Sequence, residues 1–415
     1  MSFARYLNEL AKIDDCCREG SKVLLRVDIN VPIDPSTGRI LDDYRIRAHA
    51  ETVKYLLDHG TAVVIIAHQG RPGREDFTSL EKHREVLERY VGSEVKFVED
   101  VMGPAAREAI AKLRPGEALL LDNVRFVSEE VIERRPELQA KTFLVRRLAP
   151  YFNYFVFDGF AVAHRSQPSV VGFPLVLPSC MGLVLERELR ALSLVEELRS
   201  RALLVVGGAK VLESLRAIEE AMERGTFSKV LVGGLVGVVM AVARYGIVTS
   251  ELRKMLESYG LLSCVDYARK ILERWSDRIE IPQDFAIEVE GSRIDVDIYS
   301  VSSEVMDVGS TTVRIFEEVM KNYEVVVFSG PLGYIERREF LKGTATLLRR
   351  AIEMGRKVIV GGGHTVAVVR MLGLEDRVFH VSTGGRAFLE TLVGRELPAL
   401  RALELSKKLF WGASP

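Results

Sequence analysis

Arginine and histidine side chains recur just after short apolar runs in the first half of the chain. These residues are His68, Arg71, Arg125, His164 and Arg165, and Arg45 opens the predicted helix that follows the first run. A planar guanidinium matches carboxylate and phosphate oxygens two at a time, so four arginines on one rim predict a site for a compact polyanion. Any single arginine could instead form a surface or interdomain ion pair. Their recurrence at strand ends favours the anion site.

Glycines follow the apolar runs of the second half in the same way. They lie in five segments: 207–210, 233–235, 329–331, 361–364 and 382–385. Glycine lets main-chain amides and helix N-termini face phosphate oxygens, although it also serves ordinary tight turns. Five such turns in one half predict a site for the phosphates of a nucleotide. No GxxxxGK[ST] motif occurs and no GxGxxG follows the first strand, which argues against a Walker loop and weakens a dinucleotide site. Together the two halves predict a phosphotransferase.

The elements that carry these residues are short β-rich runs alternating with amphipathic helices. The runs lie at 22–29, 61–68, 117–124, 155–163, 201–208, 229–234, 324–331 and 357–363. Because these runs are apolar on both faces and are joined by helices, they predict parallel sheets covered on both sides. Ligands in such sheets lie beyond the carboxyl ends of the strands. The predicted fold is α/β, with two doubly wound, Rossmann-like domains joined by a hinge helix.

The chain length of 415 residues is too great for one ordinary core and predicts two domains. A helical stripe at 185–198 separates two halves of similar length. The predicted organisation is therefore an N-terminal domain at 1–180, a hinge helix at 181–199, a second domain at 200–397 and a tail at 398–415. Phe410 and Trp411 predict that the tail docks on a domain, with a frayed terminus as the alternative.

The bulk composition narrows the class of protein. The chain is 47% hydrophobic and 28% charged with a net charge of −1, which argues against nucleic-acid or membrane-surface partners. No secretory signal is visible, and we expect a cytoplasmic protein. The four cysteines show no metal-ligand spacing, so we expect reduced thiols rather than a disulfide. Five Asn and four Gln are few, which suggests a hot environment, with lineage-specific drift as the alternative.

Motifs at these positions resemble those of the phosphoglycerate kinase family. RVDINVP at 26–32, AHQGRP at 67–72, LLLDNVRF at 119–126 and FDGFAVAHR at 157–165 are similar to the family's N-terminal motifs. GGAKV at 207–211, SGPLGYIE at 329–336, EFLKGT at 339–344 and STGGRAFLE at 382–390 are similar to those of its second half. The resemblance covers about residues 20 to 400. It implies two α/β domains in a monomer, with a C-terminal segment that returns to the first domain.

The resemblance also implies roles for individual residues. Those expected to hold 3-phosphoglycerate are Asp28, Asn30, Arg45, His68, Arg71, Arg125 and Arg165, with His164 on the same rim. Those expected to hold ATP or ADP are Gly208, Lys210, Gly333, Glu336 (on the ribose hydroxyls), Gly361, Gly362, Gly363, His364 and Thr365. The implied reaction moves a phosphoryl group between ATP and the carboxylate of 3-phosphoglycerate, giving 1,3-bisphosphoglycerate. Such transfer depends on in-line positioning and charge neutralisation. For this we expect Arg45, Lys210 and the amides near Gly362 and Gly384, brought together by hinge closure.

His364 is the chief departure from the family pattern, in which many members carry an aspartate that contacts Mg²⁺. Imidazole is a poor ligand for this hard cation, so the group that contacts the metal stays open. We expect His364 to donate a hydrogen bond to a phosphate while phosphates and water hold Mg²⁺. The alternative is that it only caps its helix. Ser214 replaces a second lysine, Ser329 an asparagine and Arg386 a glycine, so an impaired paralogue or a kinase for another small carboxylate dianion remains an alternative.

Overall fold

The structure, a computed structural model, describes residues 3–412 except for the side chain of Arg386. The chain divides into two compact units. Unit 1 contains the described residues up to Arg190 and those from Glu396 onward, and unit 2 is Ala191–Arg395. Among the described residues, no helix is both long and apolar enough to cross a bilayer.

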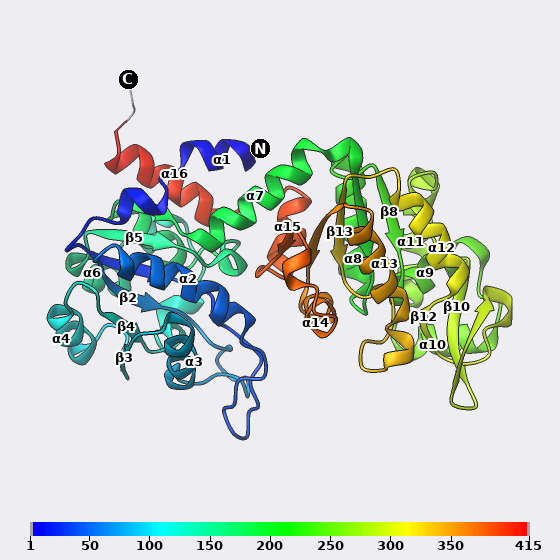
Figure 1. Ribbon diagram of the computed structural model, residues 1–415, viewed down its shortest axis with the longest axis horizontal. Coiled ribbons are helices and arrows are strands. Elements are labelled where there is room, and N and C mark those ends of the chain that lie inside the picture. Colours follow the sequence, from blue (N-terminus) through cyan, green and yellow to red (C-terminus); the bar gives the residue numbers. More distant parts are fainter. Residues whose placement is uncertain (1–2, 413–415) are drawn as a thin grey trace. The chain divides into compact units, whose positions relative to one another are not determined.

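The core of unit 1 is a six-stranded parallel sheet with the order β3-β4-β2-β1-β5-β6 (Figure 1). Its strands are β1 (Lys22–Arg26), β2 (Ala62–Ile66), β3 (Val95–Val98), β4 (Ala118–Leu121), β5 (Tyr154–Phe157) and β6 (Ser179–Met181). The central strand β1 pairs in parallel with both β2 and β5. The carboxyl ends of these strands therefore lie at one edge of the sheet, where the sequence predicts the anion-binding residues.

Helices surround this sheet. They are α1 (Phe3–Glu9), α2 (Tyr44–Asp58), α3 (Glu81–Val91), α4 (Pro104–Lys112), α5 (Pro136–Gln139), α6 (Phe143–Leu148) and α16 (Pro398–Phe410). The sequence predicts an apolar face for α2 at Ile46, Ala50, Val53 and Leu57; the first three are buried and Leu57 is half-buried. His49 and Thr52 are buried on the same helix, which the apolar pattern does not predict.

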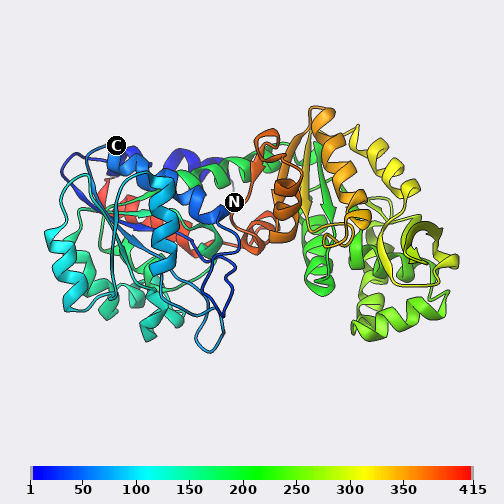
Figure 2. The ribbon, with the colours of Figure 1, turned by 60° about the horizontal axis from the view of Figure 1, so that its bottom comes forward.

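Helix α16 brings the end of the chain back to unit 1. Its Ala399 amide donates to the main-chain oxygen of Ala163 at 3.1 Å, and Ser406 Oγ donates to that of Leu177 at 3.0 Å. Just beyond the helix, the Trp411 ring stacks on Tyr154 with centroids 6.3 Å apart. The red helix lies beside the blue and cyan elements of unit 1 in two views (Figures 1 and 2). The last three residues of the predicted tail lie outside the described residues.

A disulfide joins Cys16 to Cys180, with Cα atoms 6.4 Å apart. The expectation of four reduced thiols is therefore wrong for this pair, while Cys17 and Cys264 are free. Spacing in sequence could not reveal the bond because 164 residues separate its cysteines. The short helical turn Ile13–Cys16 packs beside the edge strand β6, and this brings the two sulfurs together.

Helix α7 (Leu183–Glu197) contains the boundary between the units, within the segment predicted as the hinge. The main sheet of unit 2 is parallel, with the order β15-β14-β13-β7-β8-β9. Its strands are β7 (Ala202–Val206), β8 (Lys229–Val232), β9 (Ile279–Glu280), β13 (Val325–Ser329), β14 (Lys357–Gly361) and β15 (His380–Val381). Its helices are α8 (Val211–Arg224), α9 (Gly234–Tyr245), α10 (Ser250–Ser258), α11 (Leu262–Trp275), α12 (Ser310–Met320), α13 (Lys342–Glu353), α14 (Gly363–Met371) and α15 (Arg386–Leu392). The predicted α/β class with two parallel sheets is confirmed.

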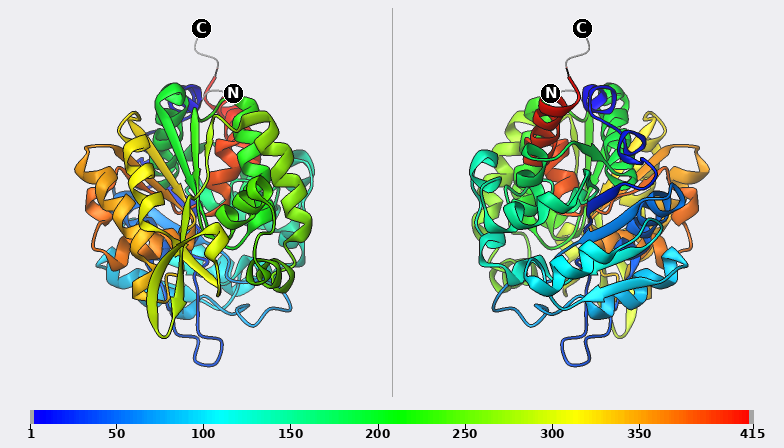
Figure 3. Two further views of the ribbon diagram at one scale, coloured as in Figure 1. Left: turned by 90° about the vertical axis from the view of Figure 1, so that its right-hand side faces the viewer. Right: turned by 90° about the vertical axis from the view of Figure 1, so that its left-hand side faces the viewer.

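Unit 2 also carries a three-stranded antiparallel sheet that the sequence did not predict. It consists of β10 (Asp284–Val289), β11 (Ser292–Asp297) and β12 (Val305–Val308), in the order β11-β10-β12. Its yellow strands face the viewer in Figure 3, left. The β10–β11 hairpin turns at Glu290 and Gly291, both with positive φ. Glutamate is an unusual residue there, so the usual Asn-Gly or Asp-Gly signal is missing.

Candidate active site

The anion site of unit 1 begins with an ion pair at the end of β1. Arg45 Nη1 lies 2.8 Å from Asp28 Oδ2 and donates to the main-chain oxygen of Asn30 at 3.0 Å. The Asn30 side chain accepts from the Gly70 amide at 3.0 Å, which ties the loop after β1 to the loop after β2. Three of the predicted substrate residues thus form one connected group.

His68 lies inside this group and is only 3% exposed. Its Nδ1 is 3.2 Å from Arg26 Nη2 and 3.9 Å from Asp28 Oδ1. Burial, followed by the charges of Arg26, Arg125, Arg45 and Arg165, lowers the pKa of His68 well below its usual value. His68 is therefore neutral at pH 7, and the arginines supply the positive charge.

Arg26 is a site residue that sequence reasoning missed. It is completely buried at the end of β1, and its Nε donates to Ser169 Oγ at 2.9 Å. Ser169 in turn donates its amide to the buried carboxylate of Glu130 at 3.0 Å. The signal for Arg26 was a single cation inside the otherwise apolar run VLLRV, residues 23–27. An arginine buried in this way holds its neighbours in place.

The remaining predicted cations lie in the loops after β2, β4 and β5. Arg125 donates to the main-chain oxygen of Gly70, and burial followed by the charge of Arg26 lowers its pKa to about 10, with smaller effects from other charges. Arg165 pairs with Glu133 at 2.9 Å. Arg71 is exposed, and its charge also lowers the pKa of Arg125. His164 is half-buried directly before Arg165. This crowding of positive charge favours a multivalent anion.

A second buried histidine supports the loops of this site. His83 Nε2 lies 3.0 Å from Gln69 Oε1, and the same Gln69 amide group bonds the main chain of Val31 in both directions, at 3.0 and 3.1 Å. Burial lowers the pKa of His83 to about 4. The neutral ring is thus the form that holds Gln69 and the loop after β1.

The pKa of His83 predicts acid sensitivity. Because the folded pKa lies below the usual value, the stability from this group is complete above about pH 6.5 and is lost as the pH falls toward 4. The free energy of unfolding should fall by about 2 kcal/mol more between pH 7 and pH 5 in the wild type than in His83→Gln. Denaturant unfolding at both pH values measures this. Equal losses in the two proteins would contradict the assignment.

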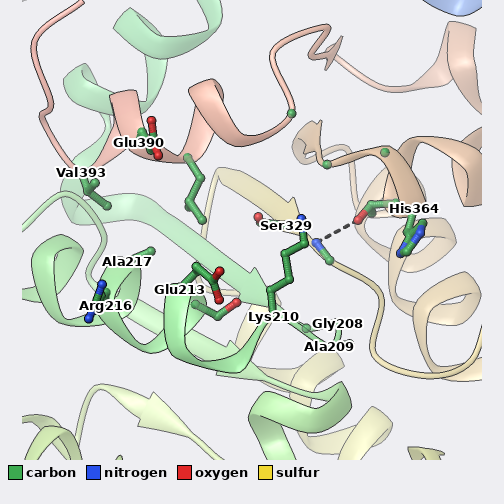
Figure 4. A pocket seen from close by; sticks show the side chains of 18 of the residues that line it. Gly208, Ala209, Lys210, Glu213, Arg216, Ala217, Ser329, His364, Glu390 and Val393 are labelled. Carbon is green, nitrogen blue, oxygen red and sulfur yellow. Dashed lines mark hydrogen bonds between the residues drawn. The ribbon is translucent and has the colours of Figure 1, made fainter. Parts of the chain in front are cut away.

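Unit 2 contains a cavity of about 490 Å³ at the carboxyl ends of β7, β13 and β14 (Figure 4). In the figure, Lys210 extends across the middle of the cavity toward Ser329. His364 lies at one end and Arg216 at the other. Of the predicted nucleotide residues, the following line it: Gly208, Lys210, Gly362, Gly363, His364 and Thr365.

Close packing of two strand-end turns explains several of the glycines. A Cβ on Gly207 would overlap the main-chain oxygen of Pro331, so no other residue fits. The amides of Gly207 and Gly208 bond the oxygens of Ser329 and Pro331 at 3.0 and 2.7 Å. The amide of Gly330 bonds Thr365 Oγ1 at 2.8 Å. These three amides therefore bond other parts of the protein, which is the tight-turn role that the sequence also allows for glycine.

The start of α14 remains as a source of amide donors. Gly362 has φ +89°, which places the chain in a conformation that favours glycine before the helix starts. The first helical bond runs from the Val366 amide to the Gly362 oxygen at 3.0 Å. The amides of Gly363, His364 and Thr365 precede this ladder and are available to an anion.

Three predicted nucleotide residues, Gly333, Glu336 and Gly361, do not line the cavity, and neither does Gly384, which was predicted to assist the transfer. Gly361 is the last residue of β14. The Gly384 amide donates to Ser382 Oγ at 3.0 Å, and the next residue, Gly385, lines the cavity. Gly333 and the exposed Glu336 lie in the segment between β13 and α13. The roles of these four residues stay predictions.

No part of the described chain, residues 3–412, offers a cluster of three or more His, Cys, Asp or Glu that could hold a metal ion. Mg²⁺ prefers six oxygens and commonly keeps several waters, taking the rest from substrate phosphates and one or two carboxylates. The described residues therefore do not fit a Mg²⁺ site built by the protein alone.

Two parallel α/β units, with a group of arginines beyond the strand ends of one and a glycine-rich cavity at the strand ends of the other, are the arrangement expected of a two-domain phosphotransferase. Residues 13–395 match the family described as "Phosphoglycerate kinase". The phosphoglycerate kinase of Pyrobaculum aerophilum is 50% identical over 409 residues, covering 97% of this chain and 99% of that protein. That of Sulfurisphaera tokodaii is 48% identical and covers 95% of each chain. The crystal structure of phosphoglycerate kinase from Pyrococcus horikoshii matches with a TM-score of 0.89 and 37% identity, covering 97% of this chain and 100% of that one. The chain belongs to the phosphoglycerate kinase family.

Proposed function

We propose that this chain catalyses reversible phosphoryl transfer between ATP and the carboxylate of 3-phosphoglycerate, in glycolysis and gluconeogenesis. The products of the forward transfer are 1,3-bisphosphoglycerate and ADP. The observation that carries the proposal is the pair of complementary sites within a chain that matches this family over nearly its whole length. One site suits a small dianion and the other suits a phosphate tail. The enzyme works in the cytoplasm as a monomer, with Mg²⁺ accompanying the nucleotide.

In this proposal unit 1 binds phosphoglycerate. Arg71, Arg125 and Arg165 hold the anionic groups of the substrate, and Arg45 faces the carboxylate that attacks the terminal phosphorus of ATP. Asp28 holds Arg45 in position through the ion pair at 2.8 Å. His68, being neutral, contributes a hydrogen bond rather than a charge.

Unit 2 binds the nucleotide in the same proposal. Lys210 neutralises charge on the phosphates from the centre of the cavity, and the first amides of α14 donate to phosphate oxygens. Mg²⁺ supplies further neutralisation when it is bound. As the oxygen of the carboxylate forms its bond to phosphorus, the bond to the ADP oxygen breaks, and no covalent enzyme intermediate is required.

The test of this function is turnover of 3-phosphoglycerate with MgATP, with the acyl phosphate trapped by hydroxylamine, at moderate and high temperature. Turnover supports the proposal. Binding of both ligands without turnover would indicate an impaired paralogue, to which Ser214, Ser329 and His364 would all contribute. Turnover only with another small carboxylate dianion would indicate a kinase of different specificity.

The identity of residue 364 predicts the metal dependence. Changing His364→Asp adds a hard oxygen ligand at the first turn of α14, so the half-saturating concentration of free Mg²⁺ should fall on the order of tenfold. Steady-state rates at fixed ATP and varied Mg²⁺ measure this. His364→Gln, which adds no charge, is the control and should stay close to the wild type. An unchanged Mg²⁺ requirement in the Asp variant would show that residue 364 does not face the metal.

A further inference from the structure

Asp158, at the end of β5, is a completely buried carboxylate that joins two distant parts of unit 1. Its Oδ1 accepts from the amides of Val184 and Leu185, at 2.8 and 3.2 Å, in the first turn of α7. Its Oδ2 lies 2.8 Å from His49 Nδ1 and accepts from Thr52 Oγ1 at 2.7 Å. One carboxylate thus holds both the start of α7 and the buried face of α2.

The second ring nitrogen of His49 reaches the substrate site. His49 Nε2 lies 3.2 Å from the main-chain amide of Asp28, and His49 is completely buried. The amide is a donor, so Nε2 must accept, and the carboxylate of Asp158 accepts from Nδ1–H. These two partners require the neutral ring with its proton on Nδ1.

The main-chain amide of Asp28 therefore bonds His49, while the carboxylate of Asp28 holds Arg45. The Asp28 carboxylate pairs with Arg45 at 2.8 Å and accepts from the Asn30 amide at 3.2 Å. On the other side, a Cβ on Gly182 would overlap Asp158 Oδ1, so the turn before α7 packs directly on the carboxylate. A continuous series of contacts runs from Arg45 through Asp28, His49 and Asp158 to α7.

We propose that His49 is a positioning residue of the phosphoglycerate site and that, together with Asp158, it couples occupancy of this site to the first turn of α7. This rests on the proposed function, since it takes Arg45 to contact 3-phosphoglycerate. When the anionic substrate binds Arg45, it competes with the Asp28 carboxylate for the guanidinium, and Asp28 shifts. The neutral ring of His49 can make only one pair of contacts, so it transmits this shift to Asp158. The first turn of α7 belongs to unit 1, and the same helix carries the chain into unit 2 after Arg190.

Two substitutions at residue 49 separate the two contacts. His49→Asn places an amide at the level of Nδ1, so it keeps the donor to Asp158 and loses the acceptor for Asp28. His49→Gln extends to the level of Nε2, so it keeps the acceptor for Asp28 and loses the donor to Asp158. Thr52→Val is the matched control, because it removes another bond to Asp158 and leaves the contact with Asp28 in place.

The kinetic readout is the KM for 3-phosphoglycerate, measured beside the KM for ATP. His49→Asn should raise the KM for 3-phosphoglycerate on the order of tenfold with little change for ATP, while His49→Gln and Thr52→Val should stay within about threefold. A purely structural role would lower stability in all three variants and would not separate Asn from Gln. Equal KM values in Asn and Gln variants would overturn the positioning role.

Hydrogen exchange of the Val184 and Leu185 amides tests the coupling in the wild type and needs no variant. Saturating 3-phosphoglycerate should change their exchange rates severalfold, and this response should be absent in both His49 variants while the ligand-free protection remains. If the wild type binds 3-phosphoglycerate and the exchange rates of these two amides do not change, the coupling is wrong. A wild type that neither binds nor turns over 3-phosphoglycerate would overturn the proposed function and this inference with it.

Discussion

Replacing Arg45 by alanine should lower kcat by about 10²–10³, the loss expected when one preorganised donor to the transferring group is removed. The guanidinium is held by Asp28 and by the main chain of Asn30, so the proposed mechanism finds it in place before the substrate binds. The fall in kcat corresponds to about 3–4 kcal/mol of transition-state stabilisation. Steady-state kinetics with both substrates varied measures it.

Arg47→Ala is the matched control for Arg45→Ala. Arg47 lies two residues further along α2, and its guanidinium carbon is 5.8 Å from the Tyr44 ring. Its removal takes the same charge from the same helix and should leave kcat close to the wild type. Because alanine at 45 also leaves the buried Asp28 carboxylate unpaired, Arg45→Lys serves as a second variant that keeps the charge. A full kcat in Arg45→Ala would exclude Arg45 from the chemistry.

Removing the disulfide should lower the free energy of unfolding of unit 1 by about 5 kcal/mol. The bond closes a loop of 164 residues, and loops of that length restrict the unfolded chain strongly. The double variant Cys16→Ala with Cys180→Ala should therefore unfold at a clearly lower denaturant concentration. Unfolding followed by circular dichroism with and without reductant measures the effect, and the variant should no longer respond to reductant.

Cys17→Ala provides the control for this change, because Cys17 is the half-buried neighbour of Cys16 and is free. Its stability should change little, and its response to reductant should match that of the wild type. Thiol titration of the denatured wild type without reductant should find two thiols, those of Cys17 and Cys264. Four reactive thiols would show that the bond does not form.

The parallel sheets and the positions of most site residues could be predicted because they depend on local patterns. Each buried strand is a run of apolar residues, and parallel strands bring their carboxyl ends to one edge of the sheet. His68, Arg125 and Lys210 could therefore be assigned to their sites from the runs that precede them.

The supporting residues could not be predicted because their partners are distant in the sequence. Arg26 bonds a serine 143 residues away, and His49 bonds an aspartate 109 residues away. An amphipathic pattern can predict that such a position is buried, but it cannot predict which distant residue will bond the side chain. Some of the predicted glycines of unit 2 line the cavity and others do not, and the amides of Gly207, Gly208 and Gly330 bond neighbouring turns of the protein. The low content of Asn and Gln and the similarity to proteins of thermophilic archaea both indicate a hot environment.

The return of α16 to unit 1 has a consequence for the synthesis of the protein. Unit 2 is one continuous stretch, whereas unit 1 is interrupted by it and completed only by residues from Glu396 onward. All of unit 2 is therefore synthesised before Ser406 and Trp411, the partners of Leu177 and Tyr154. Domains usually fold in the order in which they are translated. Here the unit that begins the polypeptide is the last to be completed, so a chain truncated before α16 would contain all of unit 2 but an incomplete unit 1.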